Sequence, residues 1–248
     1  MVNSSGNRSV SDTNASEAIP ALYTDLALHP EKDFGWGTGR ENARALGYAA
    51  HWLDGLPERA WESAASVGNP LSLGPIRPGE VLVDLGCGAG ADLCIAAQMI
   101  GTTGRAIGID VTPAMVEKAR ENAALAGLSN IEVHVASIEA TGLPDACADV
   151  VISNGAINLS AHKPCVFQEA FRILKPGGRL QFADMVRASV SEAASGESWA
   201  SCVAGTVEPE QYLKMIRAAG FTDAQLVGFT SYKTAASTIG AMFKASRP

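Results

Sequence analysis

The chain has 248 residues, of which 47% are hydrophobic and 18% are charged, as in one folded globular domain and unlike an intrinsically disordered protein. Its net charge of -7, without any Lys/Arg-rich run, disfavours nucleic acid and anionic membrane surfaces as partners. No apolar run approaches the roughly 20 residues of a transmembrane helix, which argues against a membrane-spanning protein.

The N-terminal part of the sequence predicts a tail followed by helices. Residues 1–20 are rich in Ser and Asn and poor in apolar residues, so we expect a disordered tail, and they lack the apolar segment of a signal peptide. Residues 21–75 interleave aromatic and aliphatic residues with polar ones, which indicates helices, and the run 35–39 indicates a loop. These helices either pack on the main core or form a lid over a bound ligand, and the sequence leaves both open.

Residues 76–248 predict one α/β domain in which strands alternate with helices. The expected strands are 81–85, 105–110, 131–135, 148–153 and 179–183, and the expected helices are 91–99, 112–126 and 163–174. This alternation requires right-handed crossovers, so we expect a doubly wound, Rossmann-like sheet that is mostly parallel and covered on both faces. A further helix at 209–219 precedes strand-like segments at 221–229 and 238–245, with an antiparallel strand at the C-terminus.

A glycine-rich loop separates the first predicted strand from its helix. Its sequence is Asp84-Leu85-Gly86-Cys87-Gly88-Ala89-Gly90. Glycines there allow a tight turn and a close backbone approach to a ligand, which faces the N–H groups of the next helix. Asp110 follows Gly90 by twenty residues, the spacing of an acid that binds ribose hydroxyls. The motif in this position therefore predicts a nucleotide-like ligand.

Two cofactors fit this loop, NAD and S-adenosylmethionine (SAM). Asp84 places a carboxylate where NAD has its pyrophosphate and where SAM has its cationic amino-acid portion. That carboxylate would repel the first group and attract the second, and Gly90 makes a third glycine in a tight loop. The residues therefore favour SAM, while an NAD-dependent oxidoreductase is the alternative.

Several further segments carry a resemblance to a known family. They are Gly68-Asn69-Pro70, the loop 84–90, the segment 108–115, Val151-Ile152-Ser153-Asn154, Ile157-Asn158-Leu159-Ser160, Leu174-Lys175-Pro176-Gly177-Gly178 and Ala219-Gly220-Phe221. With them, residues 69 to about 227 resemble class I SAM-dependent methyltransferases, and among these the arsenite methyltransferases most closely. The Ser-Asn and Ile-Asn-Leu-Ser runs carry the likeness to the narrower group.

The resemblance implies a SAM-binding site and a role for each of its residues. The loop residues Gly86, Cys87, Gly88 and Gly90 would lie against the methionine part of SAM, with Asp84 near its amino group. The ribose, the adenine and the floor of the reacting centre would be bound by a second set, which comprises Asp110, Val111, Met115, Ser137, Ile138, Ser153 and Asn154.

The resemblance also has departures that bear on the methyl acceptor. Arsenite methyltransferases hold trivalent arsenic with cysteine thiolates, but this chain has Val67 and Gly155 at two of those positions and keeps Cys202 at the third. One thiolate cannot form a multidentate arsenic site. We therefore expect a small-molecule acceptor other than arsenite; a non-catalytic SAM-binding protein is a further alternative.

The candidate catalytic residues are Asn154, His162 and Cys202, and Asp184 is a further candidate near the expected site. A soft acceptor atom needs little beyond alignment, whereas a hydroxyl or ammonium group also needs a base. Each candidate has a structural alternative: His162 begins a helix, Asp184 can accept backbone hydrogen bonds, and Cys202 can pack as a small hydrophobe.

The cysteines bear on the compartment. The five cysteines are odd in number and scattered, with no C-x-x-C pair. This pattern indicates reduced thiols in a cytoplasmic protein and argues against a disulfide framework or a zinc site. We therefore expect no bound metal. The sequence leaves the oligomeric state open.

Overall fold

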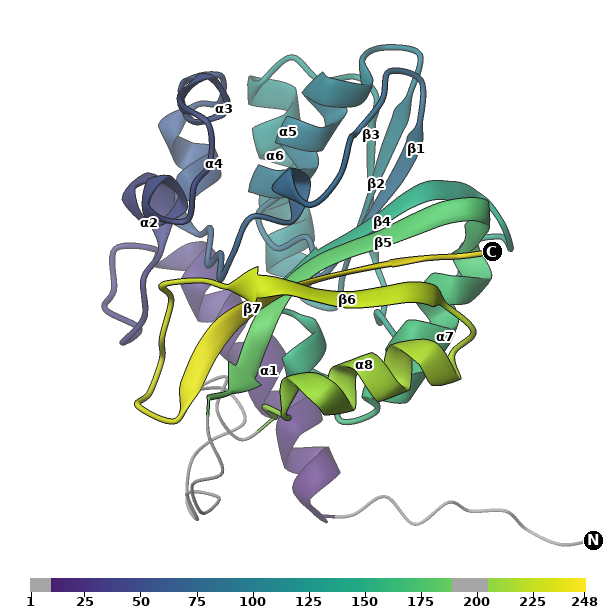
Figure 1. The fold of residues 1–248 in the computed structure, drawn as a ribbon. Coiled ribbons are helices and arrows are strands. Elements are labelled where there is room, and N and C mark those ends of the chain that lie inside the picture. The colour runs from purple at the N-terminus through teal and green to yellow at the C-terminus, as the bar shows by residue number, and fades with distance from the viewer. Residues whose placement is uncertain (1–9, 189–204) are drawn as a thin grey trace, which may run out of the picture.

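The computed structural model describes residues 10–188 and 205–248, and in them a seven-stranded sheet runs through the molecule in the order β3-β2-β1-β4-β5-β7-β6 (Figure 1). Six strands run in the same direction, and β7 is inserted antiparallel between β5 and β6. The predicted fold class, with its antiparallel C-terminal strand, is confirmed. The strands are β1 (Val81–Leu85), β2 (Arg105–Asp110), β3 (Ile131–Val135), β4 (Ala148–Asn154), β5 (Leu174–Arg187), β6 (Thr222–Phe229) and β7 (Thr238–Ser246).

Helices cover both faces of the sheet, which explains why the central strands are apolar throughout. In β1, Leu82 belongs to the core under α5 (Ala91–Ile100) and α6 (Pro113–Leu125). The next residue, Val83, belongs to the opposite core under α7 (Lys163–Ile173) and α8 (Pro209–Ala218). A short 3-10 helix, η2 (Ile157–Leu159), connects β4 to α7.

Strand β5 is longer than the sequence indicates, because β7 pairs with it from Arg179 to Arg187. The predicted segment 179–183 is only its middle part.

The N-terminal helices add a layer to the α5–α6 side of the sheet. They are α2 (Gly39–Ala45), α3 (Ala50–Asp54) and α4 (Glu58–Glu62), followed by the 3-10 helix η1 (Pro70–Ser72). Trp61 is fully buried here, and the ring of Tyr48 packs edge-on against it with centroids 6.0 Å apart. Both side chains belong to the same core as Leu82, so this layer is held by apolar burial against the main domain.

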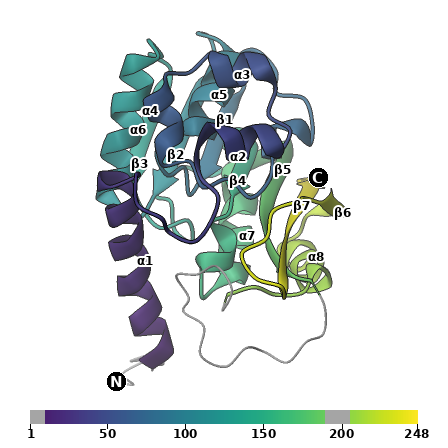
Figure 2. The same ribbon diagram turned by 90° about the vertical axis from the view of Figure 1, so that its left-hand side faces the viewer.

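A long helix, α1 (Val10–Leu28), extends downward from this layer and meets the start of α6 with its C-terminal end (Figure 2). The predicted disordered tail over residues 1–20 is therefore wrong from Val10 onward. The helix continues through Pro20, which gives up one backbone hydrogen bond. Burial at the C-terminal end of the helix offsets that cost, since Leu26 is fully buried against Met115 and Ala89.

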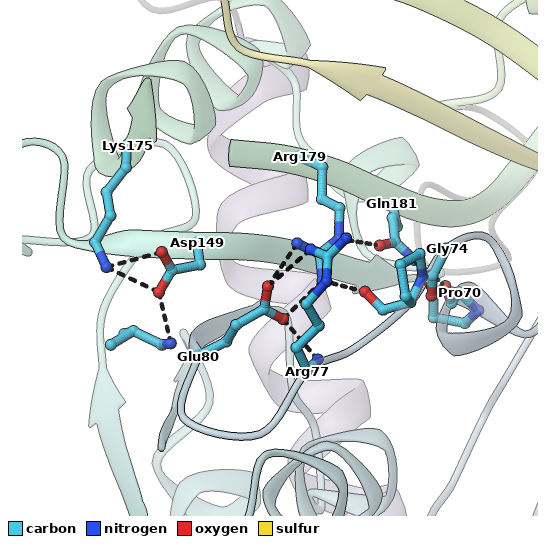
Figure 3. A network of polar contacts seen from close by, with 10 residues as sticks. Pro70, Gly74, Arg77, Glu80, Asp149, Lys175, Arg179 and Gln181 are labelled. Carbon is cyan, nitrogen blue, oxygen red and sulfur yellow. Dashed lines mark hydrogen bonds and ion pairs between the residues drawn. The ribbon is translucent and has the colours of Figure 1, made fainter. Parts of the chain in front are cut away.

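A polar network fixes the segment before β1 to residues of the inner strands β4 and β5 (Figure 3). The guanidinium of Arg179 donates to both carboxylate oxygens of Glu80, at 2.9 and 2.7 Å, and to the side chain of Gln181 at 3.0 Å. Nearby, Lys175 donates to Asp149, which also accepts the backbone N–H of Val81. Burial alone would raise the pKa of Glu80, but the bonds from Arg179 and from Arg77 outweigh it and lower that pKa.

We expect Arg179→Met to lower the free energy of unfolding by about 2 kcal/mol at pH 7, because it leaves the carboxylate of Glu80 without its main partner. The pKa of Glu80 is lower in the folded chain than its unfolded value of about 4.3, so its stabilisation exists above that pH and is lost as the pH falls. Urea unfolding at pH 7 and at pH 3 measures the free energy of unfolding of the original chain and of Arg179→Met. The difference between the two proteins should be smaller at pH 3 than at pH 7.

The control is Arg77→Met, whose side chain is 64% exposed and should contribute about 0.5 kcal/mol or less. Equal effects of the two variants, or a difference independent of pH, would contradict the assignment of the stabilising bond to Arg179.

Candidate functional site

A cavity of about 420 Å³ opens at the carboxyl ends of the central strands. Its wall includes Asp84 near the end of β1, Asp110 at the end of β2 and Asn154 at the end of β4. The crossover direction changes between β1 and β4, since β2 and β3 lie on one side and β5 on the other. This switch point is where doubly wound sheets bind their ligands.

The glycine loop between β1 and α5 forms one side of the cavity. A Cβ added to Gly86 would lie 2.2 Å from the Cβ of Ala156, and one added to Gly90 would lie 3.1 Å from the Cβ of Ala119. A Cβ on Gly88 would meet nothing within 4 Å. The outer glycines thus allow close packing, while the middle glycine leaves open space beside the backbone.

Asp84 is a buried carboxylate that faces this space. The residue is only 2% exposed and lines the cavity, and no described residue donates a hydrogen bond to its carboxylate. Burial raises its pKa well above the usual value, and the charges of Asp92 and Asp110 raise it further. A cationic group in the cavity would relieve both effects, so the arrangement fits an ammonium group.

Asp110 both shapes the loop and faces the cavity. One of its oxygens accepts the backbone N–H of Gly88 at 2.9 Å, and the other accepts that of Thr112 at 2.8 Å. Burial raises its pKa, although these hydrogen bonds oppose the shift. Each carboxylate oxygen retains a lone pair that a hydroxyl group could use.

Most of the other predicted cofactor residues also line the cavity: Gly86, Cys87, Gly88, Gly90, Val111, Met115, Ser137 and Ile138. Ser153 does not belong to the wall. It is fully buried and donates to the carbonyl of Leu85 at 2.7 Å, because successive side chains of β4 point to opposite faces. Asn154, one residue later, points into the cavity instead.

The candidate catalytic residues have different positions. Asn154 and His162 line the cavity, and His162 stands at the start of α7 without a side-chain capping bond. Asp184 does not line the cavity. It accepts the backbone N–H groups of Asn158 and Met185, which is the non-catalytic role that the sequence also allowed. Cys202 lies outside the described residues.

A polar junction that the sequence did not reveal joins the N-terminal layer to the cavity wall. The side-chain oxygen of Asn154 accepts the backbone N–H of Val67 at 3.0 Å. Its amide nitrogen lies within 3.0 Å of the hydroxyl of Tyr48, the carbonyl of Gly68 and the carboxylate of Asp92. Asp92 follows the glycine loop at the start of α5, which is the one sequence signal that could have pointed to it.

The helix α1 and the segment after α4 close the cavity from the N-terminal side. Ile19, Pro20 and Tyr23 of α1 line it, together with residues 63–66. Ser63 holds the end of the helix by donating to the carbonyl of Leu26 at 3.1 Å. The position of α1 could not be read from the composition of the tail.

The sequence profile of a family described as a methyltransferase domain matches residues 76–220, which is more than half of the chain. The chain belongs to this family. It is 35% identical over 192 residues to an arsenite methyltransferase of Halobacterium salinarum, covering 76% of this chain and 49% of that protein. It is also 36% identical over 108 residues to an aklanonic acid methyltransferase of Streptomyces, covering 44% of this chain and 49% of that protein.

A solved structure, an arsenic(III) S-adenosylmethionine methyltransferase from Chlamydomonas reinhardtii, matches with a TM-score of 0.63 and 26% identity, covering 85% of this chain and 73% of that one. The chain spans about half the length of the curated relatives that it matches.

The cofactor implied by a methyltransferase domain is SAM, and the cavity fits it. Asp84 offers an unpartnered carboxylate for the amino group, the open space at Gly88 admits a ligand beside the backbone, and Asp110 can accept from ribose hydroxyls. Neither Lys nor Arg lines the described wall, so the pyrophosphate of NAD would have no cationic partner there. The cavity therefore favours SAM over the NAD alternative.

Two further findings concern the described part of the chain. No helix in it is both long enough and apolar enough to cross a membrane. Its four cysteines, Cys87, Cys94, Cys147 and Cys165, are free thiols.

We expect Asp110→Ala to weaken the binding of SAM and of S-adenosylhomocysteine (SAH) by at least about tenfold. Each hydrogen bond to a charged group contributes about 1.5–3 kcal/mol, and the variant also frees the backbone of Gly88. Calorimetric titration measures both affinities, with the exposed Asp145→Ala as the matched control. Unchanged affinity in a folded Asp110→Ala protein would remove Asp110 from the site.

Proposed function

We propose that this chain transfers the methyl group of SAM to a small-molecule acceptor other than arsenite. Methyl transfer from SAM is supported by the unpartnered, buried carboxylate of Asp84 beside the glycine loop of a methyltransferase domain. An acceptor other than arsenite is supported by the side chains at the positions where arsenite methyltransferases have thiols.

The wall residues have distinct tasks in such a transfer. When bound, SAM supplies a methyl group on a sulfonium; the acceptor's lone pair bonds to the methyl carbon while the carbon–sulfur pair returns to sulfur, which gives neutral SAH. Asp84 holds the amino group and the glycine loop supports the methionine part. Helix α1 and residues 63–66 exclude water from the cavity.

A hydroxyl or ammonium acceptor would also have to lose a proton. His162 lines the cavity, and its imidazole is a group of the type that most often acts as a general base. Glu139 is the other candidate in the wall, but its carboxylate already accepts the hydroxyl of Ser160 at 2.5 Å. We therefore assign proton removal to His162 for acceptors that require it.

The positions of Val67 and Gly155 argue against arsenite. A Cβ on Gly155 would lie 3.2 Å from a methyl carbon of Val67, so the two positions are adjacent but carry no sulfur. Cys87 is the one cysteine of the described wall, and burial raises its pKa well above the usual value, which keeps it a thiol. Neither Cys147 nor Cys165 lines the cavity. Trivalent arsenic binds thiolate sulfur, so its ligands are missing from the described wall.

SAM turnover tests the proposal directly. Phenols, amines and small thiols should be offered in parallel with arsenite plus glutathione, and SAH formation measured for each. We expect turnover with an organic acceptor. Arsenite turnover of roughly 1 per second or more would contradict the acceptor assignment. SAM binding without turnover of any acceptor in the panel would favour the non-catalytic alternative.

We expect the double variant Val67→Cys/Gly155→Cys to bind arsenite at least about tenfold more tightly than either single variant, because two adjacent thiols can chelate arsenic. The Val67→Cys substitution also removes one of the two γ-branches of valine, which leaves more room for the new cysteine at position 155. Gly155 has φ +71°, so its substitution should cost about 1–2 kcal/mol of stability.

Arsenite titration under a reductant that prevents a disulfide, with SAH binding as a check of folding, makes the comparison. Equal arsenite affinity of all three folded variants would show that these two positions cannot form an arsenic site.

A further inference from the structure

The described wall of the cavity has an excess of negative charge. It carries the carboxylates of Asp84, Asp92, Asp110 and Glu139, and no Lys or Arg side chain. Of the residues that the structure does not describe, 189–204 contain no Lys or Arg, and 1–9 contain Arg8. The carboxylates of the described wall therefore favour a cationic group in the ligand.

Two buried lysines lie behind the wall, and each has other partners. Lys163 donates to the carbonyl of Ser160 at 2.8 Å, and its charge interacts with Asp184 and Glu139. Lys118 donates to the carbonyl of Ala27 at 3.1 Å and to the hydroxyl of Ser63 at 2.8 Å, and it pairs with Glu62.

Lys163 thus offsets Glu139, but neither lysine reaches the three aspartates. Those aspartates interact with one another, as the charges of Asp92 and Asp110 acting on Asp84 show.

Asp92 accepts a hydrogen bond at each of its two carboxylate oxygens. One oxygen accepts the hydroxyl of Tyr48 at 2.6 Å, and the other accepts the amide of Asn154 at 2.9 Å. Both oxygens accept, which suits the ionised acid, and both donors are neutral, so its charge is not cancelled. Burial raises the pKa of Asp92, and these two bonds reduce that shift without cancelling it. The N-terminus of α5 also favours an anion.

The amino-acid portion of SAM carries one ammonium and one carboxylate, so its net charge is zero, and it is the same in SAH. The positive charge that distinguishes the two molecules is the sulfonium. An acidic wall without cations therefore stabilises SAM more than SAH, and in a buried site this electrostatic difference is only weakly screened.

We propose that Asp92 is a specificity-determining residue that makes this site bind the sulfonium cofactor in preference to its neutral thioether product. The inference rests on the proposed use of SAM. Asp84 would bind the amino group and Asp110 the ribose, and both groups are the same in SAM and SAH. Asp92 has no such ligand group to bind, so its contribution to the choice between SAM and SAH is its charge. Once the methyl group has left, the wall faces a neutral ligand, which favours release of SAH.

The test compares three ligands by calorimetry: SAM, SAH and sinefungin, in which a protonated amine replaces the methylsulfonium. We expect Asp92→Asn to weaken SAM and sinefungin at least about tenfold more than SAH, a difference of 1.4 kcal/mol. Asp145→Asn is the matched control. It removes an exposed carboxylate outside the wall, so any loss should be equal for the three ligands.

Equal weakening of all three ligands in Asp92→Asn would overturn the inference and leave Asp92 a packing residue. SAH binding at native stoichiometry shows that Asp92→Asn is folded. If Asp92→Asn does not fold, Asp92→Ser, which also removes the charge, takes its place in the test. The original chain gives an independent test, because tighter binding of SAH than of both cationic ligands would also overturn the inference. Failure to bind any of the three ligands would instead refute the proposed function.

Discussion

The side chain of Asn154 is the interaction on which the arrangement of the cavity depends. Through one amide group it binds the backbone on both sides of the Val67–Gly68 peptide and the carboxylate of Asp92. The N-terminal layer, the start of α5 and the end of β4 therefore meet at one point. Because an amide both donates and accepts, no apolar or charged side chain of similar size could satisfy the same partners.

The fold could be predicted from the sequence because its signals are local. The alternation of strands and helices and the glycine loop with Asp84 each occupy a short stretch, and Asp110 follows at a spacing set by one helix and one strand. Ser153 is the exception in this part, because it does not line the cavity. Predicting a strand does not establish which of two neighbouring residues at its end faces the cavity, and here that residue is Asn154.

The remaining parts of the site depend on contacts between distant segments. Tyr48 and Asn154 are 106 positions apart, and nothing in the sequence distinguishes Tyr48 from the other aromatic residues of the helical segment 21–75. The tail was mispredicted for a related reason, since its composition and Pro20 argue against a helix. Its structure comes from Leu26 packing on α6 and on the glycine loop, which no local pattern encodes. The helical structure of α1 and the role of Tyr48 thus depend on tertiary contacts, which the composition of a segment does not reveal.

The place of β7 between β5 and β6 has a consequence for biosynthesis. Strand β5 leaves the ribosome well before β7, so its edge from Arg179 to Arg187 is unpaired while the intervening residues are made. An apolar edge of this length can pair with another nascent chain. The pairing of two strands so far apart in sequence is also slow, because the entropy of closing the loop must be overcome first. Recombinant yield should therefore be more sensitive to translation speed and chaperone supply than the stability of the finished protein suggests.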